Sequence, residues 1–305
     1  MKESFPDIGP FLKGRLKPNG GLGVDEGAFP KISIVIPCLN QGRFLERTIL
    51  SILNQNYPNT ELIVIDGGST DNTVSVIQKY ENEIAFWASE PDEGQADALN
   101  KGLARSTGEI FGWQNSDDIF LPDAFEKVVR IFSAYPEVVI CYGNWCSINE
   151  EDRITDLHYA LNPRRPKAPF ENMDAYNQSM FWRRTVCDFC GGFDKSLHKL
   201  LDNDFIIRSI NAAGLNGIYR IDAFLGGFRR HGAQKSDFMK MDDAQEREER
   251  YLENKFGFAP SDSATGKCYR LRYRWAQLLE SLRRGGPAYT LRKFRITYRR
   301  RGRFI

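Results

Sequence analysis

A pair of adjacent carboxylates, Asp117 and Asp118, follows a short apolar run in the sequence. Residues 110–113 are apolar or aromatic apart from one glycine, which predicts a buried strand, and Asn115 and Ser116 lead from it to the acidic pair. In open α/β sheets, ligands bind outside the carboxyl ends of the strands, and carboxylate oxygens are ligands for hard divalent cations. The pair therefore predicts a cation site that would in turn hold phosphate groups. The alternative is structural: Asp118 caps the next helix and Asp117 is a solvated turn residue.

Two further side chains, Asp202 and His231, have types suited to proton transfer or metal binding. Asp202 stands at the start of a predicted helix, where the ionised form of a carboxylate is favoured, which suits a general base and equally suits a cap. His231 is one of three histidines in the chain and lies in a turn containing glycine and arginine, after a predicted strand at 217–225. It is either part of a site or an ordinary loop residue.

The first half of the sequence alternates between strand and helix patterns. Strands are predicted at 31–37, 61–66, 84–89 and 110–113, with helices at about 44–53, 72–80 and 95–102. The alternation predicts an α/β fold with a mostly parallel, Rossmann-like sheet and helices on both faces. The first strand is not followed by G-x-G-x-x-G, and the sequence has no P-loop motif, so dinucleotide oxidoreductases and P-loop enzymes lose their main support. Gln95, Asp97 and Asn100 on the third helix predict sugar or ribose contacts, or else a solvated helix face.

The charge of the chain is unevenly distributed. Residues 267–305 hold 13 lysines and arginines and one acid, Glu280, a net charge of +12, which leaves −10 for residues 1–266 of the total of +2. Aromatic and leucine side chains alternate with these cations, which suits the headgroup layer of an anionic membrane. The alternatives are a helix that packs its apolar side on the main domain, or a nucleic-acid contact. We expect no nucleic-acid partner.

We expect three segments: an irregular N-terminal arm at 1–30, an α/β domain at 31–236, and a helical, basic C-terminal extension at 237–305. The sequence has no apolar stretch of 18 residues and no apolar signal-peptide core. This predicts a cytoplasmic protein, attached peripherally to the inner face of the membrane through its tail. The single C-x-x-C at Cys187 and Cys190 is weak support for zinc, and reduced, mostly buried thiols are the prediction.

Six motifs resemble those of the family 2 glycosyltransferases of the GT-A fold, in particular the bacterial branch that builds surface polysaccharides. They are Ile34-Val35-Ile36-Pro37-x-x-Asn40, Val64-Ile65-Asp66-Gly67-Gly68-Ser69-Thr70-Asp71-Asn72-Thr73, Asp92-Glu93-Gly94-Gln95-Ala96-Asp97-Ala98-Leu99-Asn100-Lys101-Gly102, Asn115-Ser116-Asp117-Asp118, Gly191-Gly192-Phe193-Asp194, and Asp202-Asn203-Asp204 followed by Arg208. Each motif alone is weak, but the combination in family order over residues 31–236 is highly specific.

The resemblance implies a GT-A fold and an inverting, metal-dependent transfer of a hexosyl or N-acetylhexosaminyl group. The donor would be a nucleotide-sugar, with UDP as the expected nucleotide, and the acceptor a lipid-linked, oligosaccharide or polysaccharide hydroxyl of the cell envelope. The resemblance also implies Mn²⁺ or Mg²⁺ held by Asp117 and His231, with Asp202 as the general base. Donor contacts are implied for Pro37, Leu39, Asn40, Asp66, Gly68, Gln95, Asp97, Asn100, Lys101, Asn115 and Ser116. The acceptor side is assigned to Gln178, Trp182 and Asp204.

Three positions depart from the family pattern. Asn115 replaces the first acid of the D-x-D motif, whose last acid is Asp117. Gly67 replaces a second acid that often contacts uracil, and Leu39 replaces the aromatic residue that commonly stacks on the base. An alternative function is therefore a catalytically silent nucleotide-sugar or glycan-binding module. Retention of Asp117 and Asp202 favours the enzyme.

Overall fold

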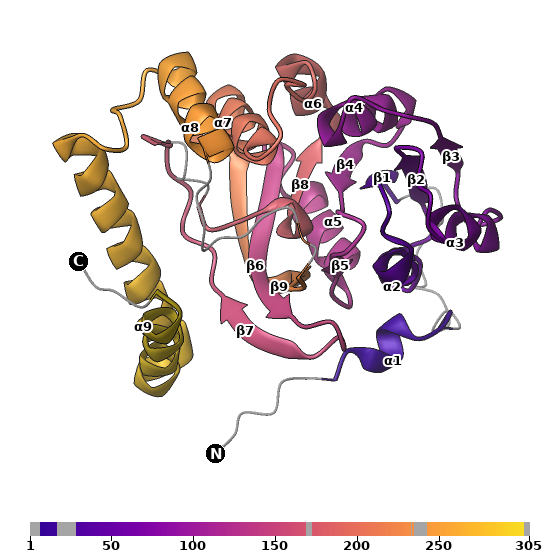
Figure 1. Ribbon diagram of the computed structural model, residues 1–305, viewed down its shortest axis with the longest axis horizontal. Helices are drawn as coiled ribbons and strands as arrows, with labels where there is room; N and C mark the ends of the chain where they lie inside the picture. The colour runs from indigo at the N-terminus through magenta and orange to yellow at the C-terminus, as the bar shows by residue number, and fades with distance from the viewer. Residues whose placement is uncertain (1–6, 17–28, 169–172, 233, 235–242, 302–305) are drawn as a thin grey trace.

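The computed structural model describes residues 7–16, 29–168, 173–232, 234 and 243–301, with only the backbone at 288 and 292–301. These residues form one sheet between two layers of helices, with a long C-terminal helix at the side (Figure 1). The predicted domain boundary after residue 236, and most of the predicted N-terminal arm, lie outside the described residues.

The sheet contains nine strands within the described residues. They are β1 (Ile32–Cys38), β2 (Thr60–Asp66), β3 (Phe86–Ser89), β4 (Ile110–Trp113), β5 (Ile119–Phe120), β6 (Ile140–Ile148), β7 (Ile154–His158), β8 (Met180–Arg183) and β9 (Ile218–Arg229). Their order is β3-β2-β1-β4-β8-β6-β9-β5, with β7 beside β6. Strands β3, β2, β1, β4, β6 and β9 run in one direction, and β5, β7 and β8 run against them. The sheet is mostly parallel, as predicted.

Helices cover both faces of this sheet. One layer holds α2 (Gly42–Leu53), α3 (Thr73–Lys79) and α5 (Ala124–Ala134), and the other holds α4 (Gln95–Arg105), α6 (Arg184–Cys190), α7 (Leu201–Ala213) and α8 (Asp243–Phe256). Successive side chains of a strand point to opposite faces. In β1, Ile34 and Ile36 therefore enter the core under α2 and α5, while Val35 enters the core under α4. Burial on both faces explains why the strands read as continuous apolar runs.

A one-turn helix, α1 (Gly9–Leu12), lies in the N-terminal segment that was predicted to be irregular. Its Phe11 and Leu12 are buried against Ile119 of β5 and Ile148 of β6. The prediction of a wholly irregular arm is therefore wrong for this turn, because its apolar side chains complete the core at one edge of the sheet.

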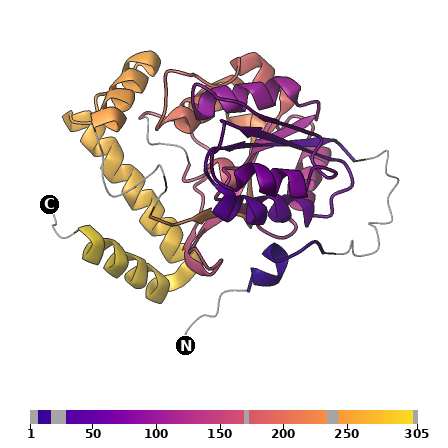
Figure 2. The same cartoon turned by 45° about the vertical axis from the view of Figure 1, so that its right-hand side comes forward.

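The C-terminal extension is helical, as predicted. Leu252 of α8 enters the same core as α4 and α7, so α8 belongs to the layer that covers the sheet. The following helix, α9 (Ala264–Arg301), is interrupted at Gly286, whose φ of 73° is left-handed, and Figure 2 shows its two segments meeting at a bend. In the described part of the chain, no helix combines the length and the apolar character needed to cross a membrane. The six cysteines are free thiols and four of them are buried, as predicted.

Candidate active site

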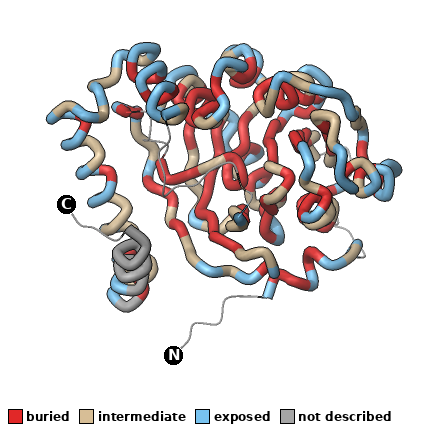
Figure 3. The backbone as a smooth tube through the Cα atoms, viewed as in Figure 1, coloured by how far each residue is buried: buried red, intermediate tan, exposed pale blue. Residues whose placement is uncertain are grey.

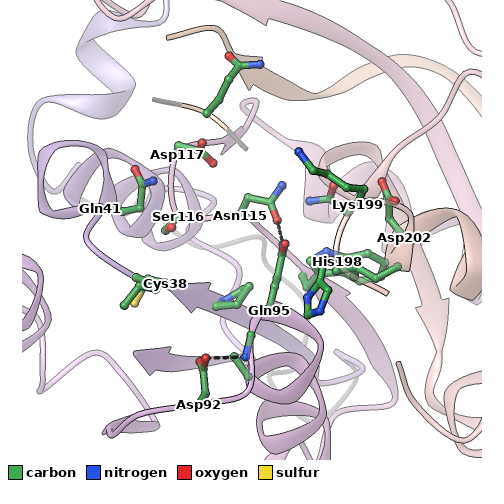
Figure 4. A pocket seen from close by; sticks show the side chains of 18 of the residues that line it. Cys38, Gln41, Asp92, Gln95, Asn115, Ser116, Asp117, His198, Lys199 and Asp202 are labelled. Atoms are coloured by element: carbon green, nitrogen blue, oxygen red, sulfur yellow. Dashed lines mark hydrogen bonds between the residues drawn. The ribbon is translucent and has the colours of Figure 1, made fainter. Parts of the chain in front are cut away.

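A cavity of about 360 Å³ opens where β1 and β4 end. Seven of the predicted site residues line it: Pro37, Leu39, Gln95, Asn115, Ser116, Asp117 and Asp202. The parallel pairing of β1 with β4, in which Val35 lies opposite Trp113, brings the carboxyl ends of both strands to the same edge. Figure 4 shows Asp117 on one side of the cavity and Asp202 on the other.

Asp117 and His231, the two residues predicted to hold a metal ion, are in direct contact. Nε2 of His231 lies 2.9 Å from Oδ2 of Asp117. The imidazole is almost completely buried and packs on the ring of Phe44 in α2, with ring centroids 4.7 Å apart. A carboxylate and an imidazole are suitable ligands for Mn²⁺. The described residues contain no group of three or more potential ligand side chains, so substrate oxygens and water would have to complete the coordination of an ion here.

Asp118, the neighbour of Asp117, is completely buried and does not line the cavity. Its Oδ1 accepts the backbone N–H of Arg229 at 2.8 Å, and its Oδ2 accepts a hydrogen bond from Nδ2 of Asn115 at 3.2 Å. Burial raises the pKa of the Asp118 carboxyl well above its ordinary value, and the nearby Asp117 carboxylate adds to the increase. The structure therefore corrects the hypothesis that both acids face a cation. Asp118 instead stabilises the loop between β4 and β5, residues 114–118.

The guanidinium of Arg229, also completely buried, fixes the same loop from the end of β9. Its Nε donates to the carbonyl oxygen of Asp117 at 2.8 Å, and its Nη1 forms an ion pair with Oδ1 of Asp152 at 2.6 Å. Burial of an unpaired guanidinium would be costly, so the ion pair with Asp152 is needed for this arrangement. The position of Asp117 therefore depends on contacts between distant parts of the chain.

Asn115, which replaces the first acid of the D-x-D motif, uses both ends of its amide within the site. Its Oδ1 accepts a hydrogen bond from Nε2 of Gln95 at 2.9 Å, while its Nδ2 donates to Asp118. An aspartate at position 115 would have no N–H to donate and would place a second carboxylate next to that of Asp118. The replacement is thus consistent with its surroundings, because the asparagine satisfies a buried acid.

Three predicted donor residues, Asn40, Asp66 and Gly68, do not line the cavity but stabilise the loops around it. The buried carboxylate of Asp66 accepts hydrogen bonds from the backbone N–H groups of Gly68 and Ser69, at 3.2 and 2.9 Å, and from the hydroxyl of Ser89 at 2.6 Å. Oδ1 of Asn40 accepts the N–H of Thr70 at 2.8 Å. The interactions of Asp66 and Asn40 join the loops after β1 and β2 to the end of β3. For Asp66, complete burial argues against the predicted direct contact with a nucleotide.

The polar residues of α4 connect this helix to the segment before α7. Asp97 forms ion pairs with Lys195 at 2.7 Å and with Lys101 at 3.3 Å, and neither Asp97 nor Lys101 lines the cavity. Asn100 donates to the carbonyl oxygen of Phe193 at 2.9 Å and accepts its N–H at 2.8 Å. These contacts give Asp97 and Asn100 a structural role, because they hold residues 193–195 against the helix that carries Gln95.

Two residues predicted for the acceptor side are completely buried. The indole of Trp182 stacks on Trp113, with centroids 4.9 Å apart, and donates to Ser209. Asp204 forms ion pairs with Lys255 at 2.8 Å and with Arg208 at 2.7 Å. Neither side chain lines the cavity, so direct contact with an acceptor is not supported for Trp182 or Asp204.

Gln178, the third predicted acceptor residue, is buried and does not line the cavity, and its amide atoms have no hydrogen-bond partner among the described residues. The adjacent Asn177 does line the cavity, and its buried Nδ2 lacks a partner within the part of the chain that the structure describes. A buried donor without a partner is costly unless a ligand or water satisfies it. Asn177 is therefore a better candidate than Gln178 for a contact with a bound sugar.

His198 and Lys199 line the cavity near Asp202 and were not identified from the sequence. Figure 4 shows the side chain of Lys199 extending towards the middle of the cavity. Their loop is held by Glu248 of α8, whose carboxylate accepts the backbone N–H groups of His198, Lys199 and Leu200, each at 2.8 Å. The only sequence signal for them was their position just before the helix that carries Asp202.

Asp92 is another residue of the cavity wall without a predicted role, although it begins one of the quoted motifs. A Cβ atom added to Gly67 would lie 2.7 Å from Oδ2 of Asp92. The Asp92 carboxylate thus occupies the space that a side chain at position 67 would need. This carboxylate stands beside the position where the family pattern has its second acid.

The comparison with protein families agrees with this geometry. Residues 33–201 match the model described as glycosyl transferase family 2, which is more than half of the chain. The chain therefore belongs to glycosyl transferase family 2.

Two relatives are similar in sequence, and one solved structure is similar in fold. The chain is 30% identical over 189 residues to an uncharacterized glycosyltransferase of Mycobacterium tuberculosis strain CDC 1551, covering 59% of this chain and 69% of the relative. It is 35% identical over 119 residues to an uncharacterized glycosyltransferase of Haemophilus influenzae, covering 38% and 47%. The crystal structure of S. aureus TarS 1-349 in complex with UDP-GlcNAc is similar in fold, with a TM-score of 0.53, 17% identity, and coverage of 67% of this chain and 60% of that chain. The fold is the GT-A fold that the resemblance implied.

Proposed function

We propose that the chain is an inverting glycosyltransferase that moves a hexosyl or N-acetylhexosaminyl group from a nucleotide-sugar to a lipid-linked, oligosaccharide or polysaccharide hydroxyl. The observation that carries the proposal is that Asp117 and Asp202 line two sides of one cavity at the carboxyl edge of the sheet. One side can receive the donor diphosphate and the other the acceptor hydroxyl. We place the reaction at the cytoplasmic face of the membrane, where a lipid-linked acceptor would be presented.

The proposed donor is a UDP-sugar, and the fold shared with TarS, solved with UDP-GlcNAc, supports it. The base would lie against Pro37 and the exposed side chain of Leu39, which offer apolar surface at the end of β1. Asp92 would accept a hydrogen bond from the ring N–H of uracil, taking over the contact that an acid at position 67 makes in the family pattern.

Asp117 and His231 would hold a Mn²⁺ or Mg²⁺ ion, which would supply positive charge next to the diphosphate leaving group. Lys199 would add a second positive charge from the opposite wall of the cavity. Since Asn115 is uncharged, the site has one negative charge fewer than a complete D-x-D motif. The ammonium group of Lys199 would therefore contribute to diphosphate binding even when no metal is bound.

Asp202 would act as the general base. It lies in the first turn of α7, where the helix dipole favours the carboxylate. As the acceptor oxygen forms its bond to the anomeric carbon, the bond from that carbon to the diphosphate oxygen breaks, and the proton of the acceptor hydroxyl passes to Asp202. Attack from the face opposite the leaving group inverts the anomeric centre.

A donor screen tests this function. Thermal unfolding and sugar-nucleotide hydrolysis are measured with UDP-, GDP- and dTDP-sugars, with and without Mn²⁺, on the natural protein and on Asp117→Ala and Asp202→Ala. We expect one nucleotide to raise the Tm most strongly with Mn²⁺, Asp117→Ala to lose the metal-dependent part, and Asp202→Ala to bind without turnover. If no nucleotide changes the Tm of the natural protein under any condition, the proposal is wrong and a glycan-binding module is favoured.

A further inference from the structure

The first segment of α9, residues 264–285, carries large apolar side chains on the side that faces solvent. An amphipathic helix on a globular protein normally packs its apolar side on the core. Here four large apolar side chains are exposed to solvent: Leu271 (58%), Trp275 (55%), Leu279 (59%) and Leu282 (43%). Figure 3 shows several exposed turns along this segment. The tail does bury Tyr273 and Tyr289 against the main domain, but these four apolar side chains take no part in that packing.

Polar contacts instead attach this segment to the body of the protein. Glu280 forms an ion pair with Arg220 of β9 at 3.0 Å, and Arg284 bonds to Glu280 and to Asp222. The hydroxyl of the buried Tyr273 accepts the backbone N–H of Asp174 at 3.0 Å. The segment is therefore held in place without using its four exposed apolar side chains.

The exposed apolar residues form one continuous stripe. Successive helix residues are about 100° apart, so the spacing 271, 275, 279, 282 places all four side chains within a sector of about 80°. Exposed cations border the stripe on both sides, with Arg272 and Arg283 along one edge and Lys267 and Arg274 along the other. The acid of this segment, Glu280, is on the opposite side of the helix. These eight exposed residues are called the α9 outer face below.

We propose that the α9 outer face binds the surface of an anionic lipid bilayer. An exposed apolar stripe marks an interaction surface, and cations along both of its edges match the phosphate layer while the apolar side chains enter the acyl boundary. A second copy of the chain is a poorer match, because two such faces packed together would bring like charges into contact. This interaction does not depend on the sugar-transfer reaction, since none of these residues lines the cavity.

Vesicle sedimentation of the full chain tests the proposal. The probes are vesicles of phosphatidylcholine alone and vesicles that also contain phosphatidylglycerol. One variant, Trp275→Gln with Leu279→Gln, removes apolar contacts, and a second, Arg272→Gln with Arg283→Gln, removes cations. Phe189→Gln, which changes an exposed aromatic side chain on α6, is the matched control. Asp117→Ala separates membrane binding from donor binding.

We expect the natural chain, Phe189→Gln and Asp117→Ala to bind the anionic vesicles equally and the neutral vesicles weakly. The cation variant should bind the anionic vesicles about thirtyfold less tightly, since each surface cation contributes roughly 1 kcal/mol. The apolar variant should lose binding at least as strongly while keeping the Tm of the natural protein, because its changed side chains are exposed. Unchanged binding by both variants overturns the proposal. It is also overturned if the natural chain is a dimer by light scattering and the apolar variant is a monomer, because the face would then pair copies of the chain.

Discussion

Nε2 of His231 lies 2.9 Å from Oδ2 of Asp117, although 114 residues separate them in the chain. The contact joins the end of β9 to the loop after β4, two strands that are separated in the sheet by β8 and β6. Arg229 stabilises the same junction through the carbonyl oxygen of Asp117. The metal-binding role proposed for the pair thus depends on the second half of the sheet as well as on the motif itself.

Asp117→Asn should weaken donor binding only when metal is present. The change keeps the size of the side chain but removes the charge that would hold a divalent cation, and we expect UDP-sugar affinity in Mn²⁺ to fall about a hundredfold, equivalent to ~2.7 kcal/mol. Calorimetric titration with and without Mn²⁺ measures this. Asp188→Asn, at an exposed acid on α6, is the control. A hundredfold loss that persists without metal would contradict the proposed ligand role.

Asp202→Asn and Asp204→Asn should separate catalysis from stability, although the two acids are only two residues apart. Asp202 lines the cavity, so its variant should keep donor binding and Tm while kcat falls about 10²- to 10⁴-fold. Asp204 is buried between Lys255 and Arg208, so its variant should lower the free energy of unfolding by about 3–5 kcal/mol. Urea unfolding and steady-state kinetics on both variants check this. Equal effects of the two variants on stability would contradict the assignment.

The strands and helices of residues 31–113 could be predicted because their signals are local, namely apolar runs and residues at helical spacing. Strands β5, β7 and β8 were not predicted. Strand β5 has two residues and forms by pairing with β9 more than a hundred residues later. Such a strand has no periodicity of its own, and only the assembled sheet defines it.

Asp117, Asn115 and Asp202 line the cavity, so the sequence placed these three motif residues together, and their roles stay predictions. Asp204 and Trp182, predicted for the acceptor side, do not line the cavity, because distant partners, Lys255 on α8 and Trp113 on β4, bury them. Lys199 was missed because the contact that holds its loop comes from Glu248, 49 residues later in the chain. Residue type indicates possible chemistry, while tertiary contacts decide which side chains meet the ligand.

Exchanging an acid between positions 67 and 92 should show which residue recognises the base. Asp92→Gly should weaken UDP binding about tenfold, because a hydrogen bond to a charged group contributes about 1.5–3 kcal/mol. Gly67→Asp alone should destabilise the protein, since its Cβ would lie 2.7 Å from Oδ2 of Asp92 and would bring two carboxylates together. The double variant should recover both UDP affinity and Tm. Unchanged UDP affinity in Asp92→Gly would contradict the proposed contact.

Glu248→Gln should lower activity although Glu248 does not line the cavity. Its two oxygens accept three backbone N–H groups, and an amide would direct its own N–H at one or more of them. The loop that carries His198 and Lys199 should then shift, so that kcat falls and the donor KM rises, with a stability loss of about 1–3 kcal/mol. Glu246→Gln, on the exposed side of the same helix, should leave kcat, the donor KM and the free energy of unfolding unchanged. A loss of stability with kcat and KM unchanged in the folded protein would show that Glu248 has a structural role only.

The carboxylate of Asp194 accepts hydrogen bonds from Tyr251 and Lys255 of α8, so the stability that these contacts supply should decrease at acid pH. Burial raises the pKa of this carboxyl, but hydrogen bonds from Lys255, Ser196 and Tyr251 outweigh burial and hold the pKa well below its ordinary value. The folded state therefore favours the ionised form, and the stability that this supplies is complete above the unfolded pKa of about 4 and is lost as the pH falls through the lower, folded value. Asp194→Asn should be less stable than the natural protein at pH 7, and the difference should shrink from about pH 5 downwards. Urea unfolding of both proteins between about pH 7 and pH 3 measures this difference, and a constant difference across that range would contradict the role of the Asp194 carboxylate.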